Sequence, residues 1–448
     1  MARINVGSSA FAGTTHEGAP ARALTSEQEL RRSVLACLLW EDGFYESGKS
    51  VADRIAALVP TVAPERVAAL AIEASSQMHL RHTPLFLVRE MARHVSHRPF
   101  VRATLAAVIQ RADELTEFLA IYWGGGDKRK AKNRPLPKSV QRGLADAFAK
   151  FNGYQLAKYN RDAPITLRDA LFLSHAEPKD DAQAAIWKQL IGGTLPAPDT
   201  WEVAITAAGK DAAKKRAEWT RLLTERKLGG FALIRNLRNL QGCKVADALI
   251  RSALTDMKPD RILPFRFLAA VRHAPTFAAE LESAMFKNLA DQPHFDGMTV
   301  VLVDGSASMN AALSAKSDMT RHDAALGVAI AARELSESCR VFAYSSRMVE
   351  VPAYRGLALS AAILGAVPAQ STLLGAAVRW LNTNVEYRRL IVITDEQSHD
   401  PVPGPNGRGY VINVAMSKPG IGYGPWNHID GWSDRVLDFV WADESERA

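Results

Sequence analysis

Apolar residues recur every three to four positions along the first part of the chain, which is the spacing of one face of a helix. The first example follows a capping box from Ser26 to Glu29 and places Leu30, Val34 and Leu38 on one face. Prolines at 64, 84 and 99 each predict the first turn of another helix. The helix opened by Pro99 is expected to continue through apolar positions to residue 122.

The same spacing continues toward residue 290. It predicts helices over 144–151, 167–173, 184–190, 218–223, 231–240, 246–254 and 277–289. We therefore expect about a dozen short helices and no strand in this part of the chain. Many short helices without strands are typical of stacked helical hairpins rather than of one compact bundle.

Residues 298–303 (MTVVLV) break the helical pattern with an uninterrupted apolar run. The run is too short for a helix and too apolar for a surface strand, so it predicts a central strand of a parallel sheet. The residues that follow, DGSAS, place Asp304, Ser306 and Ser308 on one loop at the carboxyl end of this strand. Open α/β sheets bind ligands at that edge, and carboxylate and hydroxyl oxygens are ligands that Mg²⁺ prefers.

Two later segments carry similar polar residues. A predicted helix over 324–335 and a predicted strand over 341–344 lead to Thr372, which lies just before another helix. The apolar run 390–394 then ends at Asp395. An alternative interpretation is that Asp304 and Asp395 cap helices and that the hydroxyl groups belong to turns.

Composition narrows the class of protein. The chain has 448 residues, 47% of them hydrophobic and 23% charged, as expected for a soluble protein of two or three domains. Its three cysteines, Cys37, Cys243 and Cys339, are widely spaced and predict buried thiols in a reducing compartment. No apolar run approaches the ~20 residues of a membrane span. We expect a cytoplasmic protein with a flexible tail at residues 1–25 and no membrane partner.

Charge is unevenly distributed. Residues 296–448 contain 13 Lys and Arg against 17 Asp and Glu, which leaves 42 of 55 basic and 31 of 48 acidic residues for positions 1–295. Within 124–142 the only acidic residue is Asp127, whereas the basic residues are Lys128, Arg129, Lys130, Lys132, Arg134, Lys138 and Arg142. Such a run favours phosphate binding, and a solvated basic loop is the alternative.

A set of motifs resembles the TROVE module of the Ro autoantigen family. They occur in the family's order at 80–86 (LRHTPLF), 139–152, 156–161 (LAKYNR), 171–179 (LFLSHAEPK), 231–237 and 262–268. The pattern of Asp304, Ser306, Ser308, Thr372 and Asp395 resembles the metal-ion-dependent adhesion site of von Willebrand factor A domains. Such a domain follows the TROVE module in that family, and residues 429–438 are similar to the family's ending.

This resemblance implies a TROVE-like domain over 26–290 and a von Willebrand factor A-like domain over 296–448. The first is expected to be a HEAT-like helical solenoid closed into a monomeric ring, and the second a doubly wound α/β domain that holds Mg²⁺ or another divalent cation. Ro-type rings bind small structured Y RNAs on a basic outer surface and single-stranded ends of misfolded RNAs in the central hole. Bacterial members act with exoribonucleases in RNA quality control.

The resemblance adds RNA-binding candidates to the basic run. They are Lys158, Arg161, His175, Lys179 and Arg235. Phosphates and 2′-hydroxyls dominate recognition of an RNA stem, which favours exposed Lys and Arg. His175 has the alternative role of a histidine that bonds the last carbonyls of a helix, and Arg235 that of a residue on a solvated helix face.

The sequence contains no Gly-x-Ser-x-Gly elbow and no Walker loop, so we expect a non-catalytic protein. Two function classes remain. One is an RNA-binding ring that acts in RNA turnover, and the other is a Mg²⁺-dependent protein-interaction module that captures a partner's carboxylate. Salt-dependent RNA affinity separates them, because only the first requires it.

Overall fold

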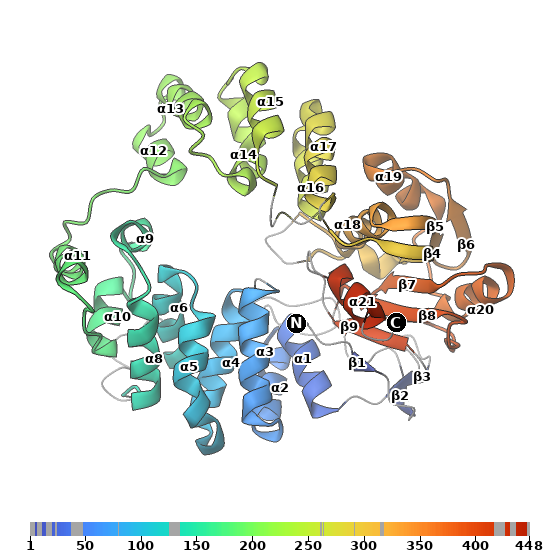
Figure 1. The fold of residues 1–448 in the computed structure, drawn as a ribbon, viewed down its shortest axis with the longest axis horizontal. Coiled ribbons are helices and arrows are strands. Elements are labelled where there is room, and N and C mark those ends of the chain that lie inside the picture. Colours follow the sequence, from blue (N-terminus) through green and yellow to red (C-terminus); the bar gives the residue numbers. More distant parts are fainter. Residues whose placement is uncertain are drawn as a thin grey trace. The chain divides into compact units, whose positions relative to one another are not determined.

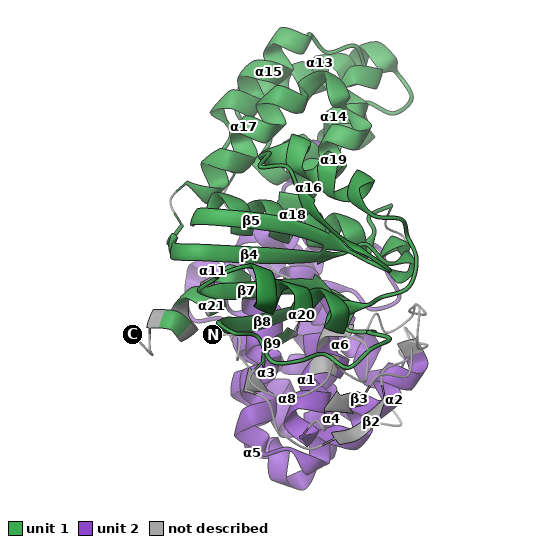
Figure 2. Cartoon of the chain, turned by 90° about the vertical axis from the view of Figure 1, so that its right-hand side faces the viewer, with its two compact units in different colours: residues 1–24, 41–46, 204–448 green, residues 25–40, 47–203 purple. Residues whose placement is uncertain are grey.

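The protein is described by a computed structural model that contains helices followed by a mixed sheet (Figure 1). The residues described are 5–6, 11–14, 20–22, 25–36, 48–78, 80–124, 135–259, 262, 264–290, 292–313, 318–415, 426–430 and 436–445. The chain forms two compact units (Figure 2). We call residues 25–40 and 47–203 the helical unit, and residues 1–24, 41–46 and 204–448 the sheet unit.

The helical unit is built from short helices around one continuous core. Its helices are α1 (Ser26–Ala36), α2 (Gly48–Leu58), α3 (Pro64–Ser76), α4 (His82–Arg93), α5 (Arg98–Val108), α6 (Ala112–Trp123), α8 (Lys138–Phe148), α9 (Gly153–Tyr159), α10 (Leu167–Ser174) and α11 (Asp181–Gly192). Helix α3 contacts α4 and α5, and α8 contacts α5 and α10. Each helix thus packs on near neighbours in the chain, which is the arrangement of stacked hairpins. The core runs from Leu30 to Leu190.

The sheet unit begins with further helices of the same kind. They are α13 (Ala212–Thr224), α14 (Gly230–Gly242), α15 (Asp247–Asp256), α16 (Pro264–His273) and α17 (Ala278–Leu289), and α12 (Trp201–Ala207) spans the boundary between the units. Helix α14 contacts α15 and α16, and α15 contacts α17. Among the described residues, no helix has the length and the apolar run that a bilayer span requires.

A seven-stranded sheet follows, in the order β1-β9-β8-β7-β4-β5-β6. Its strands are β4 (Phe295–Asp304), β5 (Ser336–Tyr344), β6 (Met348–Val351), β7 (Arg389–Thr394), β8 (Arg408–Asn413), β9 (Trp426–Asp430) and β1 (Asn5–Val6). The five strands from β9 to β5 run parallel, and β1 and β6 lie antiparallel at the edges. The expected order of a helical region followed by an α/β sheet is confirmed.

Helices cover both faces of this sheet. On one face, Val300, Leu302 and Val392 pack with Val378 and Leu381 of α20 (Leu374–Asn384). Alternate residues of a strand point to the other face, where α18 (Arg321–Glu334) contacts β4, β5 and β7. Helix α18 also contacts α16 and α19 (Gly356–Ala366), whereas α21 (Val436–Ser445) closes the described chain. Because β4 and β7 are parallel neighbours, their carboxyl ends meet at one edge of the sheet.

The structure corrects one predicted helix. The single helix expected from Pro99 to residue 122 is two helices, α5 and α6, separated at residues 109–111. The Glu114 carboxylate accepts hydrogen bonds from the Arg111 and Gln110 amides, at 3.0 and 2.7 Å, and so caps the start of α6. Arginine is not a typical capping residue, so the pattern of apolar positions hid this break. The sequence pattern also missed α2, α9, α12, α16, α19 and α21.

The beginning of the chain also differs from expectation. Residues 1–25 were predicted to be a flexible tail, but β1 pairs with β9 through Asn5 and Val6. A second pair, β2 (Phe11–Thr14) and β3 (Pro20–Arg22), forms a two-stranded sheet. Two residues suffice for backbone pairing at a sheet edge, and so short a strand leaves no apolar pattern. The predicted domain limits of 26–290 and 296–448 follow the change from helix to sheet, whereas the two compact units meet near residue 203.

We expect Gly327→Ala to lower the free energy of unfolding by about 1–3 kcal/mol, because overpacking strains a close contact. Gly327 lies where α18 crosses α16, and a Cβ there would lie 2.8 Å from the backbone nitrogen of Phe265. Gly365→Ala, in α19, is the matched control, because an added Cβ would have no heavy atom within 4 Å. Hydrogen exchange in increasing urea on the peptides of α16 and α18 checks this in both variants, and equal stabilities would contradict a tight contact between the two helices.

Candidate functional site

Strand β4 carries Asp304 to its carboxyl end, where the side chain is fully buried. Its Oδ1 accepts a hydrogen bond from the Ser306 amide at 2.8 Å, and its Oδ2 accepts one from the Thr394 hydroxyl at 2.6 Å. The Ser306 and Ser308 hydroxyls lie 3.2 Å apart. Asp304 therefore stabilises the loop that follows it, through the hydrogen bond from Ser306. It does not cap the next α-helix, which is capped by Thr320.

The other two predicted segments reach the same edge of the sheet. Asp395 follows β7, the neighbour of β4, and is fully buried. The Ala307 amide donates to the Gln370 carbonyl at 3.3 Å, which brings the loop of Thr372 beside the Ser306–Ser308 loop. No described helix follows Asp395 before β8, so it caps none. All five residues predicted to bind a cation thus lie at this edge, Asp304 at the end of β4 and the other four in loops that meet there.

The electrostatics of this edge are those of a crowded acidic pair. Burial and the neighbouring Asp395 carboxylate raise the pKa of Asp304 to about 6. Arg321, at the start of α18, places Nη1 3.3 Å from Asp395 Oδ2 with its side chain only 8% exposed. The Nε2 atom of His322 lies 3.0 Å from the Asp304 carbonyl oxygen, which can only accept, so this nitrogen carries the proton.

The donor set fits a hard divalent cation. Two carboxylates and three hydroxyl groups supply the oxygen ligands that Mg²⁺ prefers, and a cation would relieve the repulsion that raises the Asp304 pKa. The described residues hold no cluster of three or more His, Cys, Asp or Glu side chains suited to a metal, so this candidate depends on the hydroxyl oxygens. Arg321 already provides one positive charge beside Asp395.

Glu396 follows Asp395 in the sequence and was not among the predicted site residues. In the structure it is buried, its Oε1 lies 2.6 Å from His428 Nδ1, and its Oε2 accepts a hydrogen bond from Asn413 Nδ2 at 2.9 Å. These contacts join the end of β7 to β8 and β9. The backbone of Glu396 has φ 59°, a left-handed conformation that few side chains adopt. Glu396 therefore links the end of β7 to β8 and β9.

Several of the predicted RNA-binding residues lie outside the described part of the chain. These are Lys128, Arg129, Lys130, Lys132 and Arg134. Lys138 and Arg142 lie on α8 with exposed side chains. Lys158 is half-buried on α9, with its ammonium 5.6 Å from the centre of the Tyr159 ring. Arg161, His175 and Lys179 are exposed in the segments that flank α10.

His175 ends α10 in a left-handed conformation, with φ 53° and ψ 39°. Its amide donates a hydrogen bond to the Phe172 carbonyl at 3.3 Å, so the backbone itself supplies a partner for a carbonyl in the last turn of the helix. Its exposed ring makes no hydrogen bond with any residue that the structure describes. The alternative role of a ring that bonds the last carbonyls is therefore wrong, and the imidazole is available at the surface.

Sequence reasoning missed two exposed aromatic residues near these basic positions. Phe172 is 54% exposed and has the Arg168 guanidinium 5.8 Å from its ring centre. Tyr154 on α9 is 53% exposed. Exposed aromatic rings beside cations are used to stack unpaired bases. An arginine four residues before an aromatic on a helix, as at 168 and 172, was the signal available in the sequence.

Arg235, the last predicted RNA-binding residue, lies on α14 in the sheet unit and is exposed. It lines a cavity together with residues of α16 and of the segment before α18. Arg238, three residues later on the same helix, also lines this cavity. The structure therefore places Arg235 in a different unit from the other RNA-binding candidates that it describes.

Comparisons with known proteins agree with this organisation. Residues 18–192 match the TROVE domain family. A 111-residue stretch, 25% of the chain, is 29% identical to telomerase protein component 1 of Rattus norvegicus and covers 4% of that protein, so the chain spans a small fraction of that relative. The crystal structure of the Deinococcus radiodurans Ro (Rsr) protein matches with a TM-score of 0.60 and 16% identity, over 95% of this chain and 100% of that chain. The chain therefore has a segment, residues 18–192, that matches the TROVE domain family, and a fold similar to that of the Deinococcus radiodurans Ro protein.

Proposed function

We propose that this protein is a non-catalytic RNA-binding protein that captures a small structured RNA, of the Y-RNA kind, through the helical unit. The observation that carries this proposal is the group of exposed basic side chains on α8 and around α10, within the segment that matches the TROVE domain. Lys138, Arg142, Arg161 and Lys179 offer phosphate contacts, and the free ring of His175 offers a further donor. Phosphate and 2′-hydroxyl contacts are the main means of holding an RNA stem.

The variant Lys158→Ala/Arg161→Ala is expected to lose the small structured RNA that co-purifies with the tagged protein. In binding assays on that RNA, losing two phosphate contacts should reduce the slope of log affinity against log salt by about two. Sequencing of co-purified RNA and anisotropy titrations measure the two effects.

The matched control is Lys214→Ala/Arg216→Ala, which also removes one Lys and one Arg, here from exposed positions on α13 outside the TROVE match. It should retain the RNA and the salt slope of the unaltered protein. Retention of the same RNA by both double variants, or recovery of bulk ribosomal fragments alone, would show that the RNA site lies elsewhere.

The same proposal includes a closed monomeric ring whose central hole takes single-stranded ends of misfolded RNAs, in RNA quality control or turnover with a partner exoribonuclease. It is supported by the motif order and by a fold match that covers 95% of the chain. Small-angle X-ray scattering of the full chain tests the ring, since a closed ring and an open arc of the same mass differ in their distance distributions.

A second role is Mg²⁺-dependent capture of a partner protein's carboxylate. The convergence of Asp304, Ser306, Ser308, Thr372 and Asp395 on one sheet edge favours it. These residues would hold the cation, which would supply an open coordination position to an acidic ligand. The Mg²⁺ dependence of stability in the unaltered protein and in Asp304→Asn tests whether the cation binds there.

A further inference from the structure

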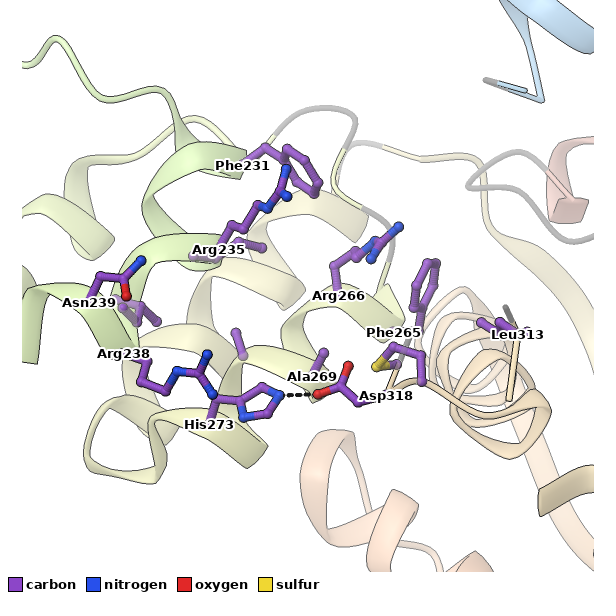
Figure 3. A pocket seen from close by; sticks show the side chains of 14 residues that line it. Phe231, Arg235, Arg238, Asn239, Phe265, Arg266, Ala269, His273, Leu313 and Asp318 are labelled. Carbon is purple, nitrogen blue, oxygen red and sulfur yellow. Dashed lines mark hydrogen bonds and ion pairs between the residues drawn. The ribbon is translucent and has the colours of Figure 1, made fainter. Parts of the chain in front are cut away.

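A cavity of about 750 Å³ opens within the sheet unit, between α14, α16 and the segment before α18 (Figure 3). Arg235 and Arg238 project from α14, Arg266 and His273 from α16, and Asp318 from the third side (Figure 3). The volume lies in the range of pockets that bind small ligands. All of its walls belong to one compact unit, so it is a single preformed site.

Positive charge dominates this cavity. Among the described residues that line it, Asp318 supplies the one carboxylate, and its hydrogen bond with His273 lowers the pKa of Asp318. Arg235, Arg238 and Arg266 form no ion pair with any residue in the described part of the chain. Three guanidinium groups therefore face the cavity without a carboxylate of their own, and an anionic ligand would neutralise them.

Arg266 shows the effect of this crowding. Desolvation and the neighbouring Arg235 charge lower the pKa of the Arg266 guanidinium. The guanidinium centre lies 4.8 Å from the Phe265 ring centre and 5.8 Å from that of Phe231. Arg266 is thus held between aromatic rings by cation–π contacts, in position for a bidentate contact with a phosphate.

Phe231 supplies an aromatic surface at the end of the same cavity and is 47% exposed. Arg235 and Arg238 follow it by four and seven residues, so the three side chains lie along one face of α14. A helix rises 1.5 Å per residue, which places the arginines about 6 and 10.5 Å from Phe231 along the axis. Along α14, an aromatic ring that can stack on a base is followed by two guanidinium groups that can bind phosphates. This order matches that of the base and the phosphates in a nucleotide.

We infer that this cavity binds a nucleoside phosphate, with the base stacked on Phe231 and the phosphates held by Arg235, Arg238 and Arg266. The inference rests on the proposed RNA-binding function and adds a separate site for an unpaired nucleotide. The ligand is either a residue of a single strand or a free nucleotide, which share this chemistry. An acidic peptide would use the arginines but would gain little from an exposed flat ring.

The test uses the full chain with three probes: a labelled single-stranded oligouridylate, uridine monophosphate as competitor, and the co-purified structured RNA. Arg235→Gln/Arg266→Gln is expected to weaken oligouridylate binding at least tenfold and to reduce its salt slope by about 1.4. Phe231→Leu is expected to weaken it about 5- to 150-fold, the range of one lost base stack. Competition by uridine monophosphate at equal affinity assigns the site to a free nucleotide, and preference for the oligomer assigns it to a strand.

Lys214→Gln/Arg216→Gln is the control for charge and should leave oligouridylate binding unchanged, and near-ultraviolet circular dichroism checks that each variant is folded. Structured-RNA binding should survive the pocket substitutions and fail in Lys158→Ala/Arg161→Ala, which separates this site from the proposed function. Two results overturn the inference. One is an unaltered protein that binds neither oligouridylate nor the nucleotide, and the other is a Phe231→Leu variant with full affinity, which would indicate an anion site without base stacking.

Discussion

Arg389→Met is expected to lower the free energy of unfolding of the sheet unit by about 3–5 kcal/mol, the cost of removing one partner from a buried ion pair. Arg389 is the first residue of β7 and is fully buried. Its Nε and Nη2 atoms bond the two Glu444 oxygens at 2.9 and 2.6 Å, and Nη1 donates to the Thr299 hydroxyl at 2.8 Å. Loss of the Arg389 guanidinium would leave the buried Glu444 carboxylate of α21 with only longer contacts, to Tyr410 at 3.4 Å and Arg388 at 3.9 Å.

The substitution also removes the link between α21 and the centre of the sheet. Hydrogen exchange in increasing urea, followed by mass spectrometry on the peptides of β4, β7 and β8, measures the stability of this unit separately from the helical unit. Separate readout matters because a chain of two units does not unfold in one step. Methionine keeps the volume and the apolar stem of arginine, so the expected loss reflects charge and hydrogen bonds.

Arg340→Met is the matched control. Arg340 also makes a two-pronged pair in this sheet, with Glu350 at 2.7 Å for both contacts, but its side chain is 34% exposed. An exposed pair contributes about 0–1 kcal/mol, so this variant should be close to the unaltered protein. Equal losses in the two variants would mean that the Arg389 pair is as well solvated as the Arg340 pair.

Asp304→Asn is expected to change how stability depends on pH. The folded-state pKa of Asp304 is raised to about 6 from 3.8, so the folded protein holds this proton more tightly than the unfolded chain. The resulting stability is complete below pH 3.8 and is lost as pH rises through 6. Without divalent cations, the unaltered protein should therefore lose about 3 kcal/mol relative to Asp304→Asn between these limits.

Magnesium should reverse this loss if it binds at the sheet edge. The cation favours both ionised carboxylates, and at a hundred times its dissociation constant a ligand stabilises the folded state by about 2.7 kcal/mol. Unfolding at pH 7.5 with and without Mg²⁺ measures the effect, which should be absent in Asp304→Asn. An equal response of both proteins, or none, would exclude this site and leave Arg321 as the counter-charge of Asp395.

The candidate metal site could be predicted from sequence because its residues follow recognisable strands. The apolar runs before Asp304 and Asp395 predict two strands, and the structure shows that they are parallel neighbours, whose carboxyl ends lie at one edge of the sheet. Arg321 could not be predicted as a neighbour of Asp395, because 74 residues separate them and no pattern relates the two. The same holds for Glu396 and His428, which meet only because β9 lies beside β8.

Some RNA-binding candidates could likewise be predicted from the sequence, whereas others are brought together only by the fold. Charge and motif order predicted Lys158, Arg161 and His175, which local chain segments present at the surface. Of the arginines that line the cavity, the sequence predicted only Arg235 as a binding residue. Arg235 lies in a recognisable helical stripe, whereas Arg266 joins it from another helix through the packing of α14 on α16.

Apolar period, capping residues and motif order by themselves determined the helical region, the α/β sheet and the five residues at its edge. These depend on local backbone preferences and on the rule that parallel strands end together, which act over short stretches of chain. Only the tertiary structure decided the edge strand at Asn5 and Val6 and the cationic cavity of α14 and α16. Each of these depends on which distant segments pack together, and that is determined by the fit of side chains across the whole fold.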